Sequence, residues 1–203
     1  MSMRILFRDK HILVVDKPSG LLSTPGSLDD SVVHRLEALF PFVGVVHRLD
    51  QGTSGILIFG LNKKSQAHLS KQFQYRTTFK LYEAKVLGTL PVNHGNIQLP
   101  ILLDWYNRPL QIIHPDGKAA LTHFQVMRRE HNCTRLTLIP HTGRSHQLRI
   151  HLQSMGFPIL GDDFYGHPDA YPMASRLNLH AKELRINHPV TEERLRFVSP
   201  TPF

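Results

Sequence analysis

The segment of residues 45–60 constrains the fold of this chain more than any other part of the sequence. It runs VVHRLDQGTSGILIFG, an apolar lead-in, a polar turn, and then apolar residues that are mostly β-branched or aromatic. The last part predicts a short buried strand. In the turn, Asp50 lies close to Arg48, and Gly52 and Gly55 allow backbone conformations that other residues avoid. Two interpretations stay open from these residues alone: a reactive carboxylate on a rigid loop, or a hairpin turn in which Asp50 caps local N–H groups.

The remaining pattern predicts an α+β fold. Helical spacing indicates three helices, near residues 33–40, 63–75 and 144–155, with Asp30 and Asn62 as N-caps of the first two. Apolar runs indicate strands at residues 5–7, 12–15, 56–60, 78–87, 119–127, 133–139, 177–186 and 194–198. Most neighbouring strands are joined by short turns. We therefore expect one domain built on a mixed, largely antiparallel sheet flanked by helices and loops.

The charge balance indicates the class of binding partner, and the cysteine content indicates the cellular compartment. The chain has 203 residues, with 24 Lys and Arg against 16 Asp and Glu, which favours a polyanionic partner and first of all a nucleic acid. The basic residues are scattered rather than gathered on one amphipathic helix, so a membrane surface is not expected. The single cysteine, Cys133, excludes an internal disulfide and is expected to be a small buried filler. With no apolar run of about 20 residues and no signal-like start, we expect a cytoplasmic protein.

Residues 47–55 (HRLDQGTSG) resemble the catalytic motif of the RluA-type RNA pseudouridine synthases. Two further matches follow in order, residues 80–84 (KLYEA) and 141–151 (HTGRSHQLRIH). Residues 16–21 (DKPSGL) are similar to the opening segment of the family. The resemblance runs from about residue 5 to the C-terminus.

Within this family, residues 99–101 and 104–109 and the short N-terminus resemble the dual-specificity group, which modifies large-subunit ribosomal RNA and the anticodon stem-loop of tRNA. The resemblance implies a pseudouridine synthase catalytic domain over residues 1–203, without a separate S4-type RNA-binding domain. It also implies stem-loop RNA as the partner, and we expect a monomer with no obligatory protein partner.

The resemblance implies three catalytic residues. Asp50 would be the nucleophile, and attack on C1′, attack on C6 and a glycal route all stay open. Tyr82 would stack on the target base, although a core tyrosine with a satisfied hydroxyl is the alternative. Arg149 would pair with Asp50, and Arg144 is the alternative for that role.

The resemblance also implies substrate contacts around these residues. Arg48 would enter the gap left by the flipped nucleotide, or else pair only with Asp50 or another local acid. Leu148 would line the uracil pocket. The full set of expected substrate-binding residues is Arg48, Leu49, Lys80, Arg144 and Leu148.

No cofactor or metal is expected. Isomerisation of uridine is not a redox reaction, and the sequence has no Walker loop, no GxGxxG and no cysteine-based zinc pattern. His141, His146 and His151 are spaced by five residues, which on a helix places successive rings about 140° apart rather than on one face where they could share a metal ion.

Two features have alternative interpretations of similar weight. Lys17 is either a solvated loop cation or a contact to RNA phosphate. The loop of residues 104–109, which holds the single tryptophan, either stacks on a splayed base or packs on itself.

Two rival functions remain. An aspartyl-phosphate phosphotransferase would use Asp50 with Asp162 and Asp163 as magnesium ligands, but position 52 is Gly where a second acid is needed. A non-catalytic RNA-binding descendant of a synthase would keep the basic surface. It could have lost the nucleophile, tyrosine or arginine, all three of which are present.

Overall fold

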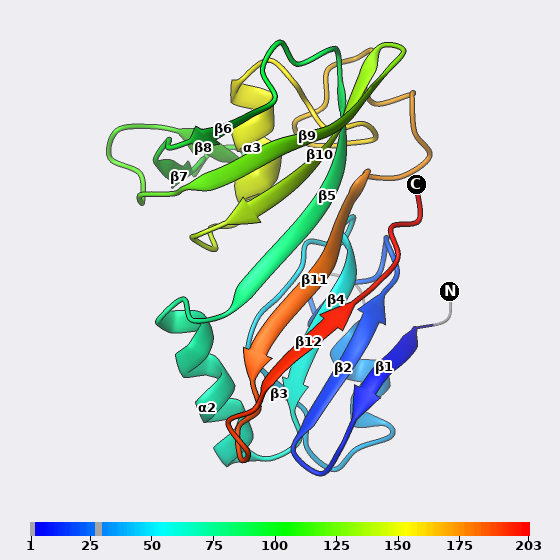
Figure 1. The fold of residues 1–203 in the computed structure, drawn as a ribbon, viewed down its shortest axis with the longest axis vertical. Helices are drawn as coiled ribbons and strands as arrows, with labels where there is room; N and C mark the ends of the chain where they lie inside the picture. Colours follow the sequence, from blue (N-terminus) through cyan, green and yellow to red (C-terminus); the bar gives the residue numbers. More distant parts are fainter. Residues whose placement is uncertain (1–2, 27–29) are drawn as a thin grey trace. The chain divides into compact units, whose positions relative to one another are not determined.

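A computed structural model describes residues 3–26 and 30–203, and these form two compact units (Figure 1). The first unit comprises the chain up to Lys80 together with His180–Pro202, and the second comprises Leu81–Leu179 with Phe203. Both units are built on β-strands with few helices, and parallel and antiparallel pairs both occur. The expected α+β class with a mixed, largely antiparallel sheet is confirmed.

The first unit is a sheet in the order β1-β2-β4-β11, in which β12 pairs with β11 and β3 with β4. The strands are β1 (Arg4–Arg8), β2 (Ile12–Lys17), β3 (Gly44–Val45), β4 (Ser54–Gly60), β11 (Leu179–Asn187) and β12 (Arg194–Val198). All residues of β4 are buried, which explains its continuous apolar sequence. The pair of β4 and β11 is parallel, and the other pairs of this unit are antiparallel. The strand that follows Asp50 is therefore central to its sheet.

Two helices belong to the first unit. In α2 (Lys63–Gln74) the Asn62 side chain accepts the Ser65 N–H at 2.9 Å, so the expected N-cap is confirmed. The expected cap of α1 (Val32–Glu37) is wrong, because Ser31 Oγ accepts the His34 N–H there. The Asp30 carboxylate instead accepts from Arg35 Nε at 2.8 Å.

The second unit has the strand order β5-β10-β9-β6, all antiparallel, and a separate β7-β8 hairpin. Its elements are β5 (Phe79–Leu87), β6 (His94–Ile97), β7 (Ile101–Leu103), β8 (Gln111–Ile113), β9 (Thr122–Glu130), β10 (Cys133–Pro140) and α3 (Gln147–Ser154). Figure 1 shows α3 against β9 and β10, and an apolar cluster holds it there through Leu148, Leu152, Leu136 and Leu138. This cluster is the core of the unit.

Two element bounds of the second unit differ from expectation. β9 begins three residues later and extends to residue 130, because a tight turn at residues 131–132 carries Asn132 in the left-handed region (φ 56°). α3 begins at Gln147 rather than at residue 144, because His146 is itself left-handed (φ 54°) and ends the helix there. Cys133 is buried as expected, and burial raises the pKa of its thiol.

Within residues 3–26 and 30–203, no helix is long and apolar enough to cross a membrane.

Candidate active site

Asp50 lies in the loop that leads into β4. The hydroxyl of Ser23 binds both backbone groups, the C=O and the N–H, of the preceding residue Leu49. Ser23 Oγ donates to the Leu49 carbonyl at 2.6 Å and accepts the Leu49 N–H at 3.0 Å. Leu49 itself is buried. The peptide groups on the N-terminal side of Asp50 therefore have little freedom.

The residues after Asp50 are held by the loop that follows β2. Lys17 Nζ donates to the Gln51 carbonyl at 2.9 Å, and the Gly20 N–H donates to the same oxygen at 2.8 Å. Ser19 Oγ donates to the Gly52 carbonyl at 2.6 Å. The loop of residues 49–52 is thus bound on both sides of Asp50, as a positioned reactive group requires.

Lys17 is fully buried, so the interpretation as a solvated cation is wrong. Besides Gln51, its ammonium donates to the carbonyls of Pro18 at 2.9 Å and Leu21 at 2.6 Å. An ammonium has three donors, and three carbonyl oxygens receive them, which compensates for the loss of water around the charge. Sequence reasoning also missed Ser19 and Ser23, although the motif-like segment DKPSGL was a signal for this loop.

β4 begins at a close approach between two backbones. Gly55 has φ +112°, and a Cβ there would lie 2.3 Å from the Ala181 carbonyl oxygen of the parallel strand β11. Ser54 Oγ lies 2.7 Å from His180 Nδ1, and His180 Nε2 lies 3.3 Å from the Ser199 carbonyl. These contacts tie the end of the Asp50 loop to β11 and to the segment after β12.

The imidazole of His47 is neutral and structural. Its Nε2 accepts the Ile58 N–H at 3.1 Å, and its ring stacks on Phe73 with centroids 4.4 Å apart. Burial, together with the positive charge of Lys80, lowers the pKa of His47 to about 3. His47 therefore anchors the start of the motif to β4 and does not exchange protons near neutral pH.

Arg48 and Lys80 are the cations that the resemblance places near the substrate, and both belong to the first unit with Asp50. Arg48 is exposed, and no described residue forms an ion pair with it, so its contact with RNA stays a prediction. Lys80 is half-buried, and burial followed by the charge of Arg76 lowers its pKa. An anionic phosphate beside such a lysine would favour its charged form.

Tyr82 and Leu148 belong to the second unit and share its apolar cluster. In β5 the side chains of Tyr82, Ala84 and Val86 alternate onto one face as expected, and the two small residues are fully buried. Tyr82 is only partly buried, and Leu148 of α3 packs in the same cluster. The structure thus brings the expected aromatic and aliphatic substrate contacts into one apolar patch.

Arg149 is buried and forms a two-pronged pair within its own unit. Its Nε donates to Asp162 Oδ2 at 2.8 Å and its Nη2 to Asp162 Oδ1 at 2.6 Å. Nη2 also donates to Asp163 at 2.8 Å, and the guanidinium lies 4.9 Å from the centre of the Phe164 ring. The sequence did not anticipate these partners. The expected pairing of Arg149 with Asp50, a residue of the other unit, stays a prediction.

Arg144 has a different environment from Arg149. It is partly exposed, and its Nε donates to the Ala119 carbonyl at 3.2 Å. The Gln147 side chain accepts the Arg144 N–H at 3.0 Å and the Thr142 hydroxyl at 2.7 Å, which shapes the turn before α3. Its exposure leaves Arg144 available to a phosphate.

The tip of the β7-β8 hairpin presents aromatic side chains to solvent. Trp105 is 67% exposed and Tyr106 95% exposed, and the Arg108 guanidinium lies 3.3 Å from the centre of the Trp105 ring. Asp104 accepts the N–H groups of Tyr106 and Asn107 and so holds the turn. The loop is thus partly packed on itself, since Arg108 covers one face of Trp105, while the exposed Tyr106 ring can stack on a base.

The three histidines that are spaced by five residues in the sequence contact different partners. His141 contacts His123, and His146 contacts the Tyr165 hydroxyl. His151 lies between Thr122 and the Leu99 carbonyl. Among the residues that the structure describes, no three His, Cys, Asp or Glu side chains are arranged to hold a metal ion.

The sequence of this chain is similar to those of known RNA-modifying enzymes. Residues 11–154 match the family model described as RNA pseudouridylate synthase. The dual-specificity RNA pseudouridine synthase RluA of Vibrio vulnificus (strain CMCP6) is 50% identical, with 91% of this chain and 78% of that protein covered. The enzyme of the same name from Escherichia coli (strain K12) is 45% identical, with 98% and 93% covered.

A solved structure has the same fold. Human RNA Pseudouridylate Synthase Domain Containing 1 superimposes with a TM-score of 0.87 at 28% identity, covering 100% of this chain and 84% of that one. A family model that matches most of the chain, relatives of this identity and the carboxylate loop described above agree with one another. The chain belongs to the RNA pseudouridylate synthase family, in its RluA-type group of enzymes.

Proposed function

We propose that this protein isomerises uridine to pseudouridine in both a large-subunit ribosomal RNA hairpin and tRNA anticodon arms, with Asp50 as the nucleophile. The dual specificity is that of the relatives from Vibrio vulnificus and Escherichia coli, whose names state it. The two units would act as one catalytic domain, in a monomer located in the cytoplasm with its RNA.

The observation that carries the proposal is the loop around Asp50. Ser23 binds both backbone groups of Leu49, and Lys17 binds the Gln51 carbonyl, so the backbone is held on each side of the carboxylate. Covalent catalysis at a nucleotide needs one carboxylate placed beside the reacting carbons, and the reaction requires neither redox change nor gain of atoms. A pre-positioned carboxylate is the central requirement of this chemistry.

The target uridine must leave its stack before it reacts, and three features would assist this step. Arg48 is exposed and has no ionic partner among the described residues, so its guanidinium is available to fill the gap. Tyr82 and Leu148 would enclose the flipped uracil. Lys80 would contact a phosphate beside it.

The hairpin with Trp105 and Tyr106 supports an RNA substrate with unpaired bases. Exposed aromatic rings stack on bases, at about 1–3 kcal/mol per base. A stem-loop offers such bases in its loop, whereas a regular duplex does not. Recognition would then depend on loop shape as much as on base identity.

The decisive experiment maps pseudouridine in total RNA from cells with the gene, without it, and with the Asp50→Asn variant in its place. We expect loss of signal at one ribosomal hairpin and in tRNA anticodon arms without the gene, and no recovery with the variant. The variant should still bind RNA with nearly wild-type affinity, because only one carboxyl oxygen changes. Substantial turnover by Asp50→Asn would overturn the assignment of the nucleophile, and loss at one class of RNA alone would overturn the dual specificity.

A further inference from the structure

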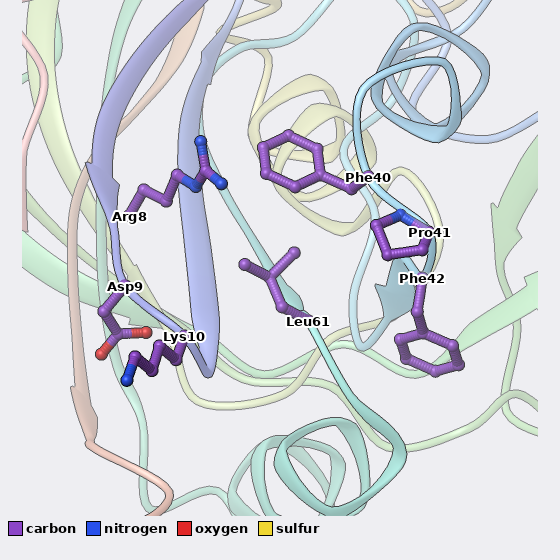
Figure 2. Close-up of a pocket in the computed structure, with 7 residues that line it drawn as sticks. All are labelled: Arg8, Asp9, Lys10, Phe40, Pro41, Phe42 and Leu61. Atoms are coloured by element: carbon purple, nitrogen blue, oxygen red, sulfur yellow. The ribbon is translucent and has the colours of Figure 1, made fainter.

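A pocket of about 690 Å³ lies at the β1-β2 turn of the first unit (Figure 2). Residues 8–10 at the β1-β2 turn, residues 40–42 and Leu61 line it. The Leu61 N–H, just after β4, donates to the His11 carbonyl at this turn at 2.8 Å. Asp50 precedes β4, whose seven residues span about 20 Å at about 3.3 Å each. The pocket is therefore distinct from the site around Asp50.

One wall of this pocket is apolar and partly aromatic. Phe40 is largely buried, while Phe42 and Leu61 are half-buried and Pro41 is exposed. The guanidinium of Arg8 lies 4.7 Å from the centre of the Phe40 ring, and Figure 2 shows it facing that ring. Because Arg8 lies over the largely buried Phe40 ring, the planar surfaces left for another planar group are the Arg8 guanidinium and the half-buried Phe42 ring.

The other contribution is positive charge, from Arg8 and Lys10, in excess of the single carboxylate of Asp9 that also lines the pocket. Among the described parts of the chain, neither Arg8 nor Lys10 has an acidic partner at salt-bridge distance. The nearby carboxylate of Asp9 is engaged elsewhere, because its Oδ1 accepts the N–H groups of His11 and Ile12, each at 2.7 Å. Its Oδ2 lies 2.8 Å from His188 Nε2. The pocket therefore presents two cations and one carboxylate, which is held by other groups, next to an apolar wall.

We propose that this pocket binds a second nucleotide of the RNA substrate, distant from the uridine that is isomerised. An unpaired base would stack on the Arg8 guanidinium and the Phe42 ring, and its phosphate would contact Arg8 and Lys10. A purely apolar ligand would leave both cations unused, and a simple anion would leave the aromatic wall unused. The proposal rests on RNA being the substrate, and it adds a contact that selects longer RNAs over minimal stem-loops.

Two RNAs test the proposal. One is a minimal stem-loop, and the other is the same stem-loop with single-stranded extensions. Loss of base stacking on Phe42→Ala should lower the ratio of kcat/KM for the extended RNA over the minimal RNA by about fivefold to hundredfold. In the Arg8→Ala/Lys10→Ala double variant, the slope of log affinity against log salt for the extended RNA should become less steep by about 0.7, since one single-strand phosphate is no longer neutralised.

The matched control is Lys63→Ala/Lys64→Ala, which removes two exposed cations of α2 outside the pocket. It should leave the ratio between the two RNAs unchanged. An equal ratio in the pocket variants and this control would overturn the proposal. Failure of the wild type to isomerise either RNA would instead refute the proposed function, so the two failures are distinguishable.

A fluorescent reporter identifies what enters the pocket. In the Phe42→Trp/Trp105→Phe variant the single tryptophan lies in the pocket, and Trp105→Phe alone is the blank. We expect quenching by the extended RNA and little change with the minimal stem-loop or with uridine monophosphate. Saturable quenching by the mononucleotide without any by the extended RNA would overturn the proposal in favour of a free nucleotide.

Discussion

Replacing Lys17 by methionine removes the buried ammonium from the loop beside Asp50 while keeping most of the side-chain volume. The three carbonyl oxygens that it binds, those of Pro18, Leu21 and Gln51, then lose a charged donor. Each such hydrogen bond contributes about 1.5–3 kcal/mol. Burying the ammonium itself costs several kcal/mol. The difference predicts that Lys17→Met lowers the free energy of unfolding by about 2–4 kcal/mol.

Equilibrium unfolding in urea at pH 7 measures this loss, with Lys71→Met as the control. Lys71 is exposed on α2, so the control should stay within about 0.5 kcal/mol of wild type. A second readout is kcat/KM, measured well below the unfolding temperature. Because Lys17 fixes the carbonyl next to Asp50, a displacement of about 1 Å would lower kcat/KM about 100-fold.

The two readouts separate two roles of Lys17. An unfolding free energy within 0.5 kcal/mol of wild type, with unchanged kcat/KM, would refute the reasoning entirely. A destabilised variant with wild-type kcat/KM would show that the ammonium supports the fold but does not position Asp50.

Three further predictions follow from contacts in the two units. Arg149→Ala leaves the carboxylate of Asp162 buried without its cation, so the free energy of unfolding should fall by about 3–5 kcal/mol and isomerisation should be lost. A variant that is as stable as wild type in urea and fully active in a turnover assay would contradict the importance of this buried pair. His47 has a folded pKa of about 3, below the unfolded value of about 6.5, so between these pH values the unfolded chain binds one more proton than the folded chain. The free energy of unfolding should therefore fall as the pH drops below about 6.5, by about 2 kcal/mol at pH 5. Urea titrations of wild type and His47→Gln at pH 7 and pH 5 should show a smaller pH-dependent loss for the variant. Gly55→Ala forces a Cβ to within 2.3 Å of a backbone oxygen of β11 and should lower the free energy of unfolding by about 2–5 kcal/mol. Gly156→Ala, at φ +83° with nothing within 4 Å of its Cβ, should lower it by only about 1–2 kcal/mol. Similar melting temperatures for the two variants would argue against the close approach at Gly55.

Much of the fold was predictable because it rests on local patterns. The continuous apolar run of β4 predicted a buried strand, and the N-cap at Asn62 was recognisable from neighbouring residues. The cap of α1 and the start of α3 were not predictable in the same way. Ser31 and Asp30 are both good capping residues, and only the competing bond of Asp30 with Arg35 separates them.

Some residues of the candidate site were likewise predictable from the sequence, and others were not. The order of the motifs identified Asp50, Arg48 and Tyr82 as candidates, since each stands at a recognisable position in a short segment. The structure shows that Arg48 is exposed and that Tyr82 lies against an apolar cluster, and their roles toward RNA stay predictions.

By itself, the sequence determined the α+β class, the basic character and the family resemblance, because composition, periodicity and short motifs are properties of neighbouring residues. Only the tertiary structure decided that Lys17 is buried and that Ser23 binds Leu49. It also decided that Arg149 binds Asp162. The Lys17–Gln51, Ser23–Leu49 and Arg149–Asp162 contacts join residues that are 13 to 34 positions apart in the chain. A side chain that serves as a surface cation or as a buried donor has the same letter in the sequence, and its role depends on which carbonyls and carboxylates the folded chain brings to it.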